Sequence, residues 1–245
     1  MKSILMIGAI GLPEVIIFLI LGAIIYFLTN KNFKMDKKLK QLLKGRTAEQ
    51  QEVIKYFYSD GGCLSKNISD SEYEEKVMAK VKSMNFKQKA LDKLGVDESQ
   101  VNEVEPIHFE GWKFDEKKGY IKYGKDKVWR SSIYQITWIF CSSEQVYVYQ
   151  YTLNMDEDGK KEQTEEYFYK DITNFSSSSS TVEKNDVLIK TNCKGESEYG
   201  RRTVDTDLFK ITVPGDKLEC AMVSNDYTEG AIQGLKAKLR EKKNL

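Results

Sequence analysis

The stretch Val146-Tyr147-Val148-Tyr149-Gln150-Tyr151 decides the fold of most of this chain. Valines and tyrosines alternate in it, and a period of two residues places successive side chains on opposite faces of a β-strand. The same alternation returns in Tyr167-Phe168-Tyr169. Because valine and aromatic residues favour strands and the surrounding sequence lacks helical spacing, we expect an antiparallel β-domain around this stretch.

Aromatic and β-branched runs on both sides predict further strands. Asp156-Glu157-Asp158-Gly159 and Pro214-Gly215-Asp216 have the composition of tight turns, so each is expected to join two strands in a hairpin. Residues 176–180, a run of serines, are instead predicted to form a flexible loop. The expected strands are residues 119–123, 129–140, 145–153, 165–175, 187–191, 207–213 and 217–222.

The strands are followed by one amphipathic helix, expected over residues 228–242, with its apolar positions on one face. Seven antiparallel strands and a C-terminal helix resemble the pleckstrin-homology-like (PH-like, or PH/GRAM-like) fold, including its bacterial membrane-associated members. Tyr169-Lys170-Asp171-Ile172-Thr173-Asn174-Phe175 is similar to the aromatic-x-Asp-Ile segment that ends a strand in that family. One departure is that the family often has a tryptophan in the last helix, and this helix has none.

The resemblance implies an α+β fold in which an antiparallel β-barrel or sandwich is closed at one end by the C-terminal helix. It also implies binding of lipids, peptides or partner proteins through loops, without a set of site residues that spacing alone can transfer.

Residues 31–105 have helical periodicity instead. Thr47-Ala48-Glu49-Gln50 and Asp97-Glu98-Ser99-Gln100 have the pattern of capping boxes, and Gly95 is placed to end a helix. We therefore expect three parts: a transmembrane anchor over residues 1–30, a basic juxtamembrane stretch and small helical subdomain over 31–105, and the PH-like β-domain with its helix over 106–245. An apolar stripe of the subdomain, expected to face an internal core, comprises Tyr73, Val77, Val81 and Met84.

The anchor is predicted from residues 4–28, which read ILMIGAIGLPEVIIFLILGAIIYFL and contain Glu14 as their only charge. A helix needs about 20 apolar residues to cross a bilayer core of roughly 30 Å. Pro13 suits a first helical position, and Glu14 then lies where the helix dipole favours a negative charge. We expect a transmembrane helix that begins at Pro13. The alternative is a continuous span that buries Glu14 in the bilayer and gives that carboxylate a role in assembly.

A basic flank gives the anchor a direction, because positive residues stay on the cytoplasmic side. The expected location is the inner (plasma) membrane, single-pass, with the N-terminus out and the C-terminal domain cytoplasmic. A cleaved signal peptide is disfavoured, since Thr29-Asn30-Lys31 is no small-residue cleavage site. The flank could also attract anionic headgroups, by about 1 kcal/mol per charge, or act on topology alone. Its seven basic residues are Lys31, Lys34, Lys37, Lys38, Lys40, Lys44 and Arg46.

Gly11-Leu12-Pro13-Glu14-Val15-Ile16-Ile17 resembles the start of twin-arginine-translocase pore subunits, which open with a similar Gly-x-x-Glu-aliphatic pattern. Those subunits continue with a Phe-Gly hinge and an amphipathic helix, whereas this chain has Phe27-Leu28-Thr29-Asn30. The resemblance therefore implies a bacterial single-span anchor and does not carry over the function of those subunits.

Composition limits the remaining classes. The net charge is +1, and the 14 tyrosines are spread through the expected strands without a basic face, so nucleic-acid binding is not expected. The four cysteines form no C-x-x-C pair, and Cys141 and Cys220 are expected to be buried free thiols in a reducing compartment. His108 is the only histidine, and a structural role is favoured for it. No cofactor is expected.

Two loops carry candidate site residues. Asn154, Asp156, Asp158 and Glu165 match the spacing of an EF-hand calcium loop, but the expected flanks are strands, so an exposed hairpin turn is favoured and no metal is expected. A second basic cluster lies near the first strands, where basic residues hold phosphates in phosphoinositide-binding PH-like domains. It could bind headgroups, or be a solvated hairpin balanced by acids such as Glu116 and Asp126. The cluster comprises Lys122, Lys125, Lys127 and Arg130.

Together these features predict a non-enzymatic, membrane-anchored cytosolic module that binds or scaffolds through a protein partner or anionic lipid headgroups. One alternative is an accessory subunit of a larger bacterial membrane complex, in which Gly8, Gly11 and Glu14 contact other spans. Another is an enzyme that uses His108 with the nearby Glu105 or Glu110.

Overall fold

The computed structural model describes residues 20–21, 37–58, 67–114, 119–191 and 197–243. The chain divides into two compact units, residues 1–41 and 42–245. In the first, Ile20 and Leu21 are helical, and α2 (Lys37–Leu43) begins there. No helix formed by the described residues is both long and apolar enough to cross a membrane. Apart from Ile20 and Leu21, the expected anchor, with Pro13 and Glu14, lies outside these residues.

The helices of the second unit begin and end where their capping residues predict. The Thr47 box is formed, because the Gln50 amide donates to Thr47 Oγ1 (3.2 Å) and the Thr47 amide donates to Gln50 Oε1 (3.0 Å). The Asp97 box is formed as well, and Gly95 ends its helix in the left-handed conformation (φ +67°), both as expected. These elements are α3 (Ala48–Tyr58), α4 (Asp70–Ser83), α5 (Phe86–Leu94) and the 3-10 turn η1 (Glu98–Gln100).

The strands of the described residues form three antiparallel sheets. The first has the order β1-β4-β5-β6, the second is the β2-β3 hairpin, and the third has the order β7-β8-β9. The α+β class with antiparallel sheets and a C-terminal helix is therefore confirmed. The bounds are β1 (Val104–Trp112), β2 (Ile121–Tyr123), β3 (Trp129–Ser131), β4 (Ile133–Cys141), β5 (Gln145–Asn154), β6 (Lys160–Phe168), β7 (Asn174–Thr191), β8 (Ser197–Val213), β9 (Asp216–Met222) and α6 (Asp226–Lys243).

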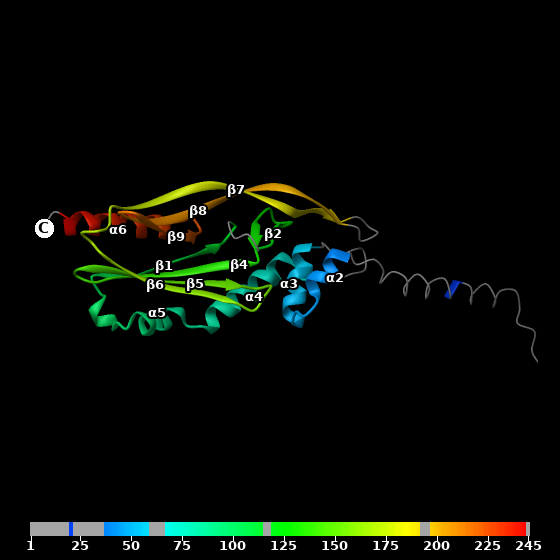
Figure 1. Ribbon diagram of the computed structural model, residues 1–245, viewed down its shortest axis with the longest axis horizontal. Helices are drawn as coiled ribbons and strands as arrows, with labels where there is room; N and C mark the ends of the chain where they lie inside the picture. Colours follow the sequence, from blue (N-terminus) through cyan, green and yellow to red (C-terminus); the bar gives the residue numbers. More distant parts are fainter. Residues whose placement is uncertain (1–19, 22–36, 59–66, 115–118, 192–196, 244–245) are drawn as a thin grey trace, which may run out of the picture. The chain divides into compact units, whose positions relative to one another are not determined.

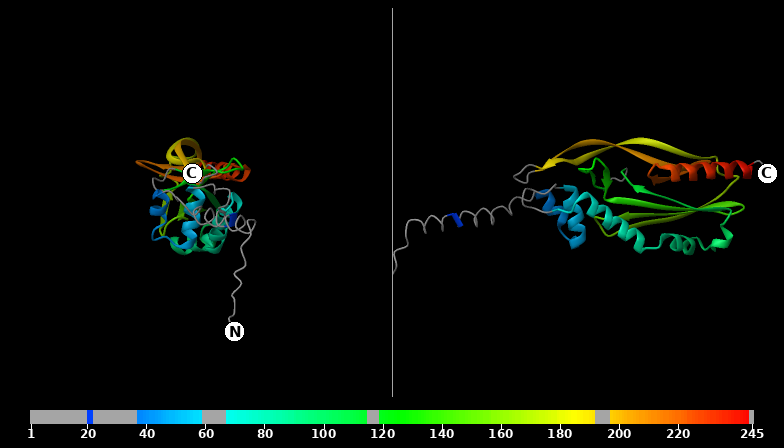
Figure 2. Two further views of the ribbon diagram at one scale, coloured as in Figure 1. Left: turned by 90° about the vertical axis from the view of Figure 1, so that its right-hand side faces the viewer. Right: turned by 180° about the vertical axis from the view of Figure 1, so that it is seen from behind.

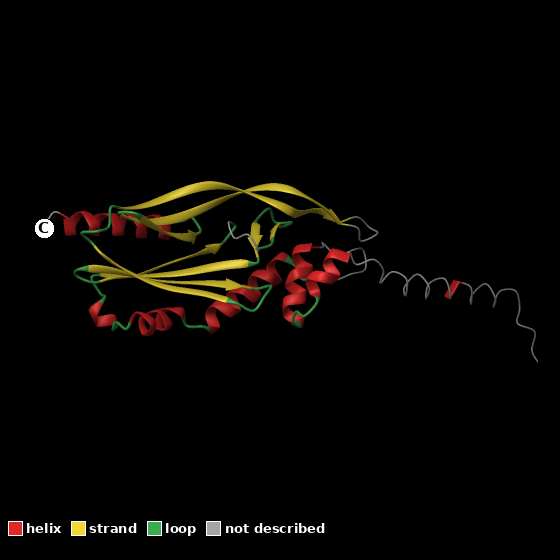
Figure 3. Ribbon diagram, viewed as in Figure 1, coloured by secondary structure: helices red, strands yellow, loops and turns green. Residues whose placement is uncertain are grey.

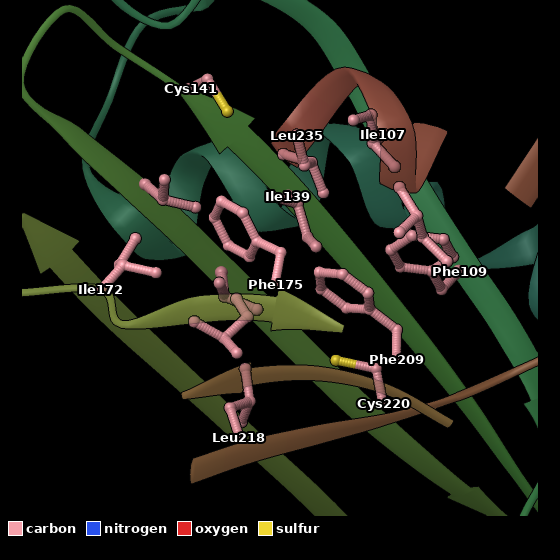
Figure 4. Close-up of a cluster of buried hydrophobic side chains, with 14 of the residues drawn as sticks. Ile107, Phe109, Ile139, Cys141, Ile172, Phe175, Phe209, Leu218, Cys220 and Leu235 are labelled. Carbon is pink, nitrogen blue, oxygen red and sulfur yellow. The ribbon is translucent and has the colours of Figure 1, made fainter. Parts of the chain in front are cut away.

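The two larger sheets face each other across the main core (Figure 1). Phe209 lies at its centre, with its ring stacked on Phe109 (centroids 4.7 Å) and Phe175 (5.9 Å). Helix α6 contributes Ile232 and Leu235 to this core, and Figure 4 shows Leu235 among the core side chains around Phe109, Phe175 and Phe209. Cys141 and Cys220 are buried free thiols, as expected.

Helices α4 and α5 cover the face of the β1-β4-β5-β6 sheet that is turned away from this core (Figure 3). Tyr73 of α4 stacks on Trp112 of β1, and Phe86 of α5 packs on Tyr151 of β5. Strands β4 and β5 are consequently buried on both faces. The predicted helical stripe is an internal contact where Tyr73 and Val77 are fully buried.

Two glutamines join the sheets through side-chain amides. Gln135 of β4 accepts a hydrogen bond from the Ala221 amide (2.7 Å), and Gln150 of β5 donates to the Glu219 carbonyl (3.0 Å). Ala221 and Glu219 belong to β9, which is the edge strand of its sheet. The glutamines therefore satisfy backbone groups of a strand edge that would otherwise be buried without partners.

The serine run is the clearest correction to the sequence analysis. Residues 176–180 were expected to be a loop, but they lie inside β7, paired in continuous register with 206–210 of β8. Low complexity describes side chains, whereas a strand needs a partner for its backbone, and β8 supplies one. Together β7 and β8 form a long twisted ribbon, seen from behind in Figure 2, that includes the predicted strands 187–191 and 207–213.

Other strands differ from the expected ones as well. The predicted strand 165–175 is divided, because the Asp171 amide bonds to the Phe168 carbonyl (2.9 Å) in a turn between β6 and β7. The predicted strand 129–140 is divided at Ser132, whose amide donates to the Tyr120 carbonyl (2.8 Å) next to β2, while its carbonyl accepts from the Met155 amide (2.9 Å) next to β5. Strand β1 was not among the expected strands. Both expected hairpin turns are confirmed, as are the strands at 145–153 and 217–222 and the C-terminal helix.

Candidate functional site

The basic cluster at residues 122–130 is mostly used inside the fold. Lys122 is only 7% exposed, and its Nζ donates to the Tyr56 carbonyl (3.0 Å) while lying 4.5 Å from the centre of the Tyr56 ring. Arg130 is 2% exposed. Both cations are buried and bonded internally, which supports neither the headgroup-binding alternative nor a solvated position for Lys122 and Arg130. Lys125 and Lys127 are exposed.

Arg130 instead links the β2-β3 hairpin to α4. Its guanidinium donates two hydrogen bonds to the Asp126 carboxylate, and its Nη2 lies 2.9 Å from Glu74 Oε1. The hydrogen bonds from Arg130 lower the pKa of Asp126 to about 2, against an opposing effect of burial. Asp126 was one of the acids expected to balance this hairpin, and it pairs with Arg130; Glu116, the other acid named, lies outside the described residues. Asp70 extends the link by accepting from the Tyr56 hydroxyl and the Lys125 amide (2.8 Å each).

The other predicted headgroup ligands belong to the anchor flank. Lys31 and Lys34, like Pro13 and Glu14, lie outside the described residues. Lys37 and Lys38 begin α2, and the side chain of Lys40 in the same helix is exposed.

The calcium-loop pattern is not assembled. Asn154 ends β5, but Glu165 is within β6 and pairs with Val148, six residues away along β5 and thus about 20 Å from Asn154. The favoured hairpin is formed instead, and its extended strands separate residues that an EF-hand loop brings together. The described residues contain no group of three or more His, Cys, Asp or Glu side chains arranged to hold a metal ion.

The β5-β6 turn docks on the start of α3. Gln50 donates to Asp158 Oδ1 (2.7 Å), and Arg46 Nη2 lies 3.5 Å from Glu157 Oε2. Between these contacts Asp156 is 2% exposed, and its Oδ1 has no hydrogen-bond partner in the described part of the chain. Burial raises the pKa of Asp156 to about 6, although a hydrogen bond with Ser132 acts in the opposite direction. This buried acid was not foreseen as such, because the sequence predicts only an exposed turn.

His108 lies in a row of aromatic rings on the face of β1 and β4 against which α4 and α5 also pack. Its ring stacks on Trp138 (centroids 5.0 Å), which continues to Phe140 (6.0 Å). On the other side, the Tyr227 hydroxyl accepts from the His108 amide (3.2 Å) and lies 3.3 Å from His108 Nδ1. His108 does not line the hollow next to Glu52 and Lys76 or the one next to Tyr58 and Tyr120. The His108 ring is therefore held by contacts on two sides.

The row is open to solvent at its α6 end, where Tyr227 is 49% exposed and the neighbouring Val223 is 51% exposed. Acids accompany it. Glu110 is on the same face of β1 as His108, and Asp226 directly precedes Tyr227. We call the rings of His108, Trp138 and Tyr227, with Glu110 and Asp226, the acidic aromatic surface.

No basic residue occurs in the two segments that supply most of this surface. Residues 104–112 contain Glu105 and Glu110, residues 223–235 contain Asp226 and Glu229, and neither segment has a lysine or arginine. With four carboxylates, no Lys or Arg and His108 neutral, their formal charge is −4, whereas the whole chain is +1. Trp138 and Tyr227 were not predicted as site residues. Only the exposed position of Tyr227, off the apolar face of the last helix, could have indicated it.

The chain was compared with models of protein families, with curated proteins and with solved structures, and none of them matches.

Proposed function

We propose that this protein is a single-pass, membrane-anchored binding or scaffolding module, non-enzymatic, with the unit 42–245 on the cytoplasmic side of a bacterial inner membrane. The observation that carries the proposal is the apolar run 4–28, which contains one charge and is followed by seven basic residues. A run of this length suits a bilayer core, and its basic flank favours the cytoplasmic side.

The proposal includes a PH-like assignment for the folded unit. Two antiparallel sheets packed face to face support it, as does a C-terminal helix that inserts Ile232, Leu235 and Leu239 into the core between them. Strand β1 and the long β7-β8 ribbon go beyond the seven strands from which this assignment was made.

The structure gives protein contacts more support than headgroup contacts on the folded unit. Lys122 and Arg130 are committed to internal bonds, which leaves Lys125 and Lys127 as the exposed cations of that cluster. Headgroup attraction is therefore assigned to the flank that begins at Lys31. The acidic aromatic surface suits a protein partner, because tyrosine and tryptophan are enriched at interfaces and an acidic surface repels anionic lipids.

The membrane assignment is tested by expressing the full chain in bacteria and extracting the membranes with alkaline carbonate. The wild-type chain is expected to stay in the membrane pellet. Replacing Ile20 and Leu21 by lysine is expected to release it, since each lysine at the centre of a span costs about 2.5–3.5 kcal/mol of insertion free energy. The matched control replaces the same two residues by valine and should stay in the pellet. Release of the wild-type chain by carbonate would contradict the proposal.

Orientation needs a second measurement. In spheroplasts, added protease should leave the folded unit intact, and in inverted vesicles it should digest the unit's exposed chain. Cleavage in spheroplasts alone would reverse the proposed topology while leaving the anchor in place.

A further inference from the structure

The acidic aromatic surface has the two properties that recognise a cationic side chain. The face of an aromatic ring attracts a cation placed within about 6 Å of its centre. A carboxylate pairs with the same cation, and an arginine can do both at once because its planar guanidinium stacks and donates bidentate hydrogen bonds. Tyr227 offers a half-exposed ring and Asp226 an exposed carboxylate, and Glu110 offers a partly exposed carboxylate that also accepts from the Tyr134 hydroxyl.

The spacing on β1 favours an extended ligand. His108 and Glu110 are two residues apart on one strand face, and this corresponds to about 7 Å. Side chains at alternate positions of an extended peptide have the same separation. One cationic side chain can therefore lie over the rings while the next reaches Glu110.

The charge of the segments that form this surface indicates the charge that a partner should carry. Residues 104–112 and 223–235 contain four carboxylates and no lysine or arginine, in a protein with 38 basic and 37 acidic residues overall. Complementary charge accelerates association and rejects partners of the same sign. The carboxylates of these two segments would repel an acidic peptide, a nucleic acid or an anionic membrane.

We propose that the acidic aromatic surface docks an extended, arginine- and lysine-rich segment of a partner protein, with alternate cationic side chains on the Tyr227–His108–Trp138 rings and on Glu110. The inference rests on the proposed function, since it names the class of partner that the binding module takes. Arginine is preferred over lysine because only its planar group stacks on the rings while pairing with a carboxylate.

The test measures fluorescence anisotropy of a labelled peptide in which arginines alternate with glycines, added to the full chain in a non-ionic detergent. Tyr227→Ala is expected to weaken binding by about two- to fivefold, the range for one exposed cation–π contact. Glu110→Gln, which keeps the size and hydrogen-bonding capacity of the side chain, should weaken it up to about fivefold. Tyr227→Phe keeps the ring and should bind like the wild type. Added salt should weaken binding to the wild type more than to Glu110→Gln.

The controls are matched to the two variants. Tyr123 is also 49% exposed, and Tyr123→Ala removes an exposed ring on β2. Glu166→Gln removes an exposed carboxylate on β6, at the opposite edge of the same sheet. Neither change should affect the affinity. Equal weakening by the controls, unchanged binding in Tyr227→Ala and Glu110→Gln together, or equal binding of the glutamate counterpart of the peptide would each overturn the inference.

Its failure is distinguishable from failure of the proposed function. A chain that resists carbonate extraction but does not bind the arginine peptide would retain the membrane assignment and lose this partner class. A chain that binds the peptide through Tyr227 and Glu110 but is released by carbonate would keep the docking surface and lose the anchor.

Discussion

Asp156 offers the most direct test of how the folded unit is held together. Its carboxyl group is almost fully buried under the β5-β6 turn, between the Gln50–Asp158 and Arg46–Glu157 contacts, and its Oδ1 has no hydrogen-bond partner among the described residues. Asp156→Asn keeps the size of the side chain and removes the ionisation. The other groups whose charge acts on it are Glu157 and Arg46.

The magnitude follows from the difference in pKa between the folded and unfolded chain. Burial raises the pKa of Asp156 from 3.8 to about 6. Between these values the folded protein binds a proton that the unfolded chain does not, so the free energy of unfolding falls as the pH rises. About two pKa units correspond to about 3 kcal/mol. The wild type should therefore lose about 3 kcal/mol of stability between about pH 4 and about pH 6, relative to Asp156→Asn.

The assay is urea unfolding of the full chain in non-ionic detergent, followed by tryptophan fluorescence across this pH range. Glu166→Gln, which changes an exposed acid on β6 away from this turn, is the control and should keep the pH dependence of the wild type. The reasoning would be refuted by a stability difference between wild type and Asp156→Asn that stays constant from pH 4 to pH 6. A constant difference would mean that the carboxyl is hydrated or paired when the protein is folded.

Other substitutions test the remaining contacts. Arg130→Met should lower the free energy of unfolding by about 1–3 kcal/mol in urea titrations, because it removes charge-assisted hydrogen bonds but leaves half-exposed carboxylates that water can reach; an unchanged midpoint would contradict its linking role. Phe209→Ala should cost about 3–5 kcal/mol by the same method, since its ring is fully buried between two others; a loss below about 1 kcal/mol would place that ring outside the core. Gln135→Leu should expose the Ala221 amide to faster hydrogen exchange and cost about 1–3 kcal/mol, and equal protection of that amide would show that another group accepts its hydrogen bond. Glu14→Leu should leave membrane insertion intact, and loss of a crosslinked partner complex in native membranes would favour the accessory-subunit alternative over a passive anchor.

Local signals in the sequence were sufficient where a structure depends on neighbouring residues. The Thr47 and Asp97 boxes, the Gly95 cap and both hairpin turns are formed as expected, because each involves groups within a few positions of one another. The strand at residues 146–151 was also predicted correctly from its alternation. Its partner strands, which decide the sheet order, could not be derived from that pattern.

The errors arose where distant segments decide the outcome. Lys122 lies between Ile121 and Tyr123 in a short strand, where its charge predicts an exposed side chain. In the structure α3 packs next to it, and the Tyr56 carbonyl of that helix accepts a hydrogen bond from Lys122 Nζ. The serines at 176–180 have no strand signal of their own, and β8 makes them a strand. Asp156 was expected to be exposed in a polar turn, and it is the docking of that turn on α3 that buries it.

The two glutamine bonds have a consequence for the order in which the protein is completed during synthesis. Gln135 and Gln150 are in strands that leave the ribosome before β9, the last strand, which contains their partners Ala221 and Glu219. The sheet β1-β4-β5-β6 can form its backbone hydrogen bonds before then. The side-chain amides of Gln135 and Gln150, however, have to bond to water until β9 has been made. In the nascent chain this face of the sheet therefore stays in contact with water until nearly all of the protein has been translated. A chain cut short before residue 216 would keep that face, together with the apolar side chains around it, open to chaperones and proteases.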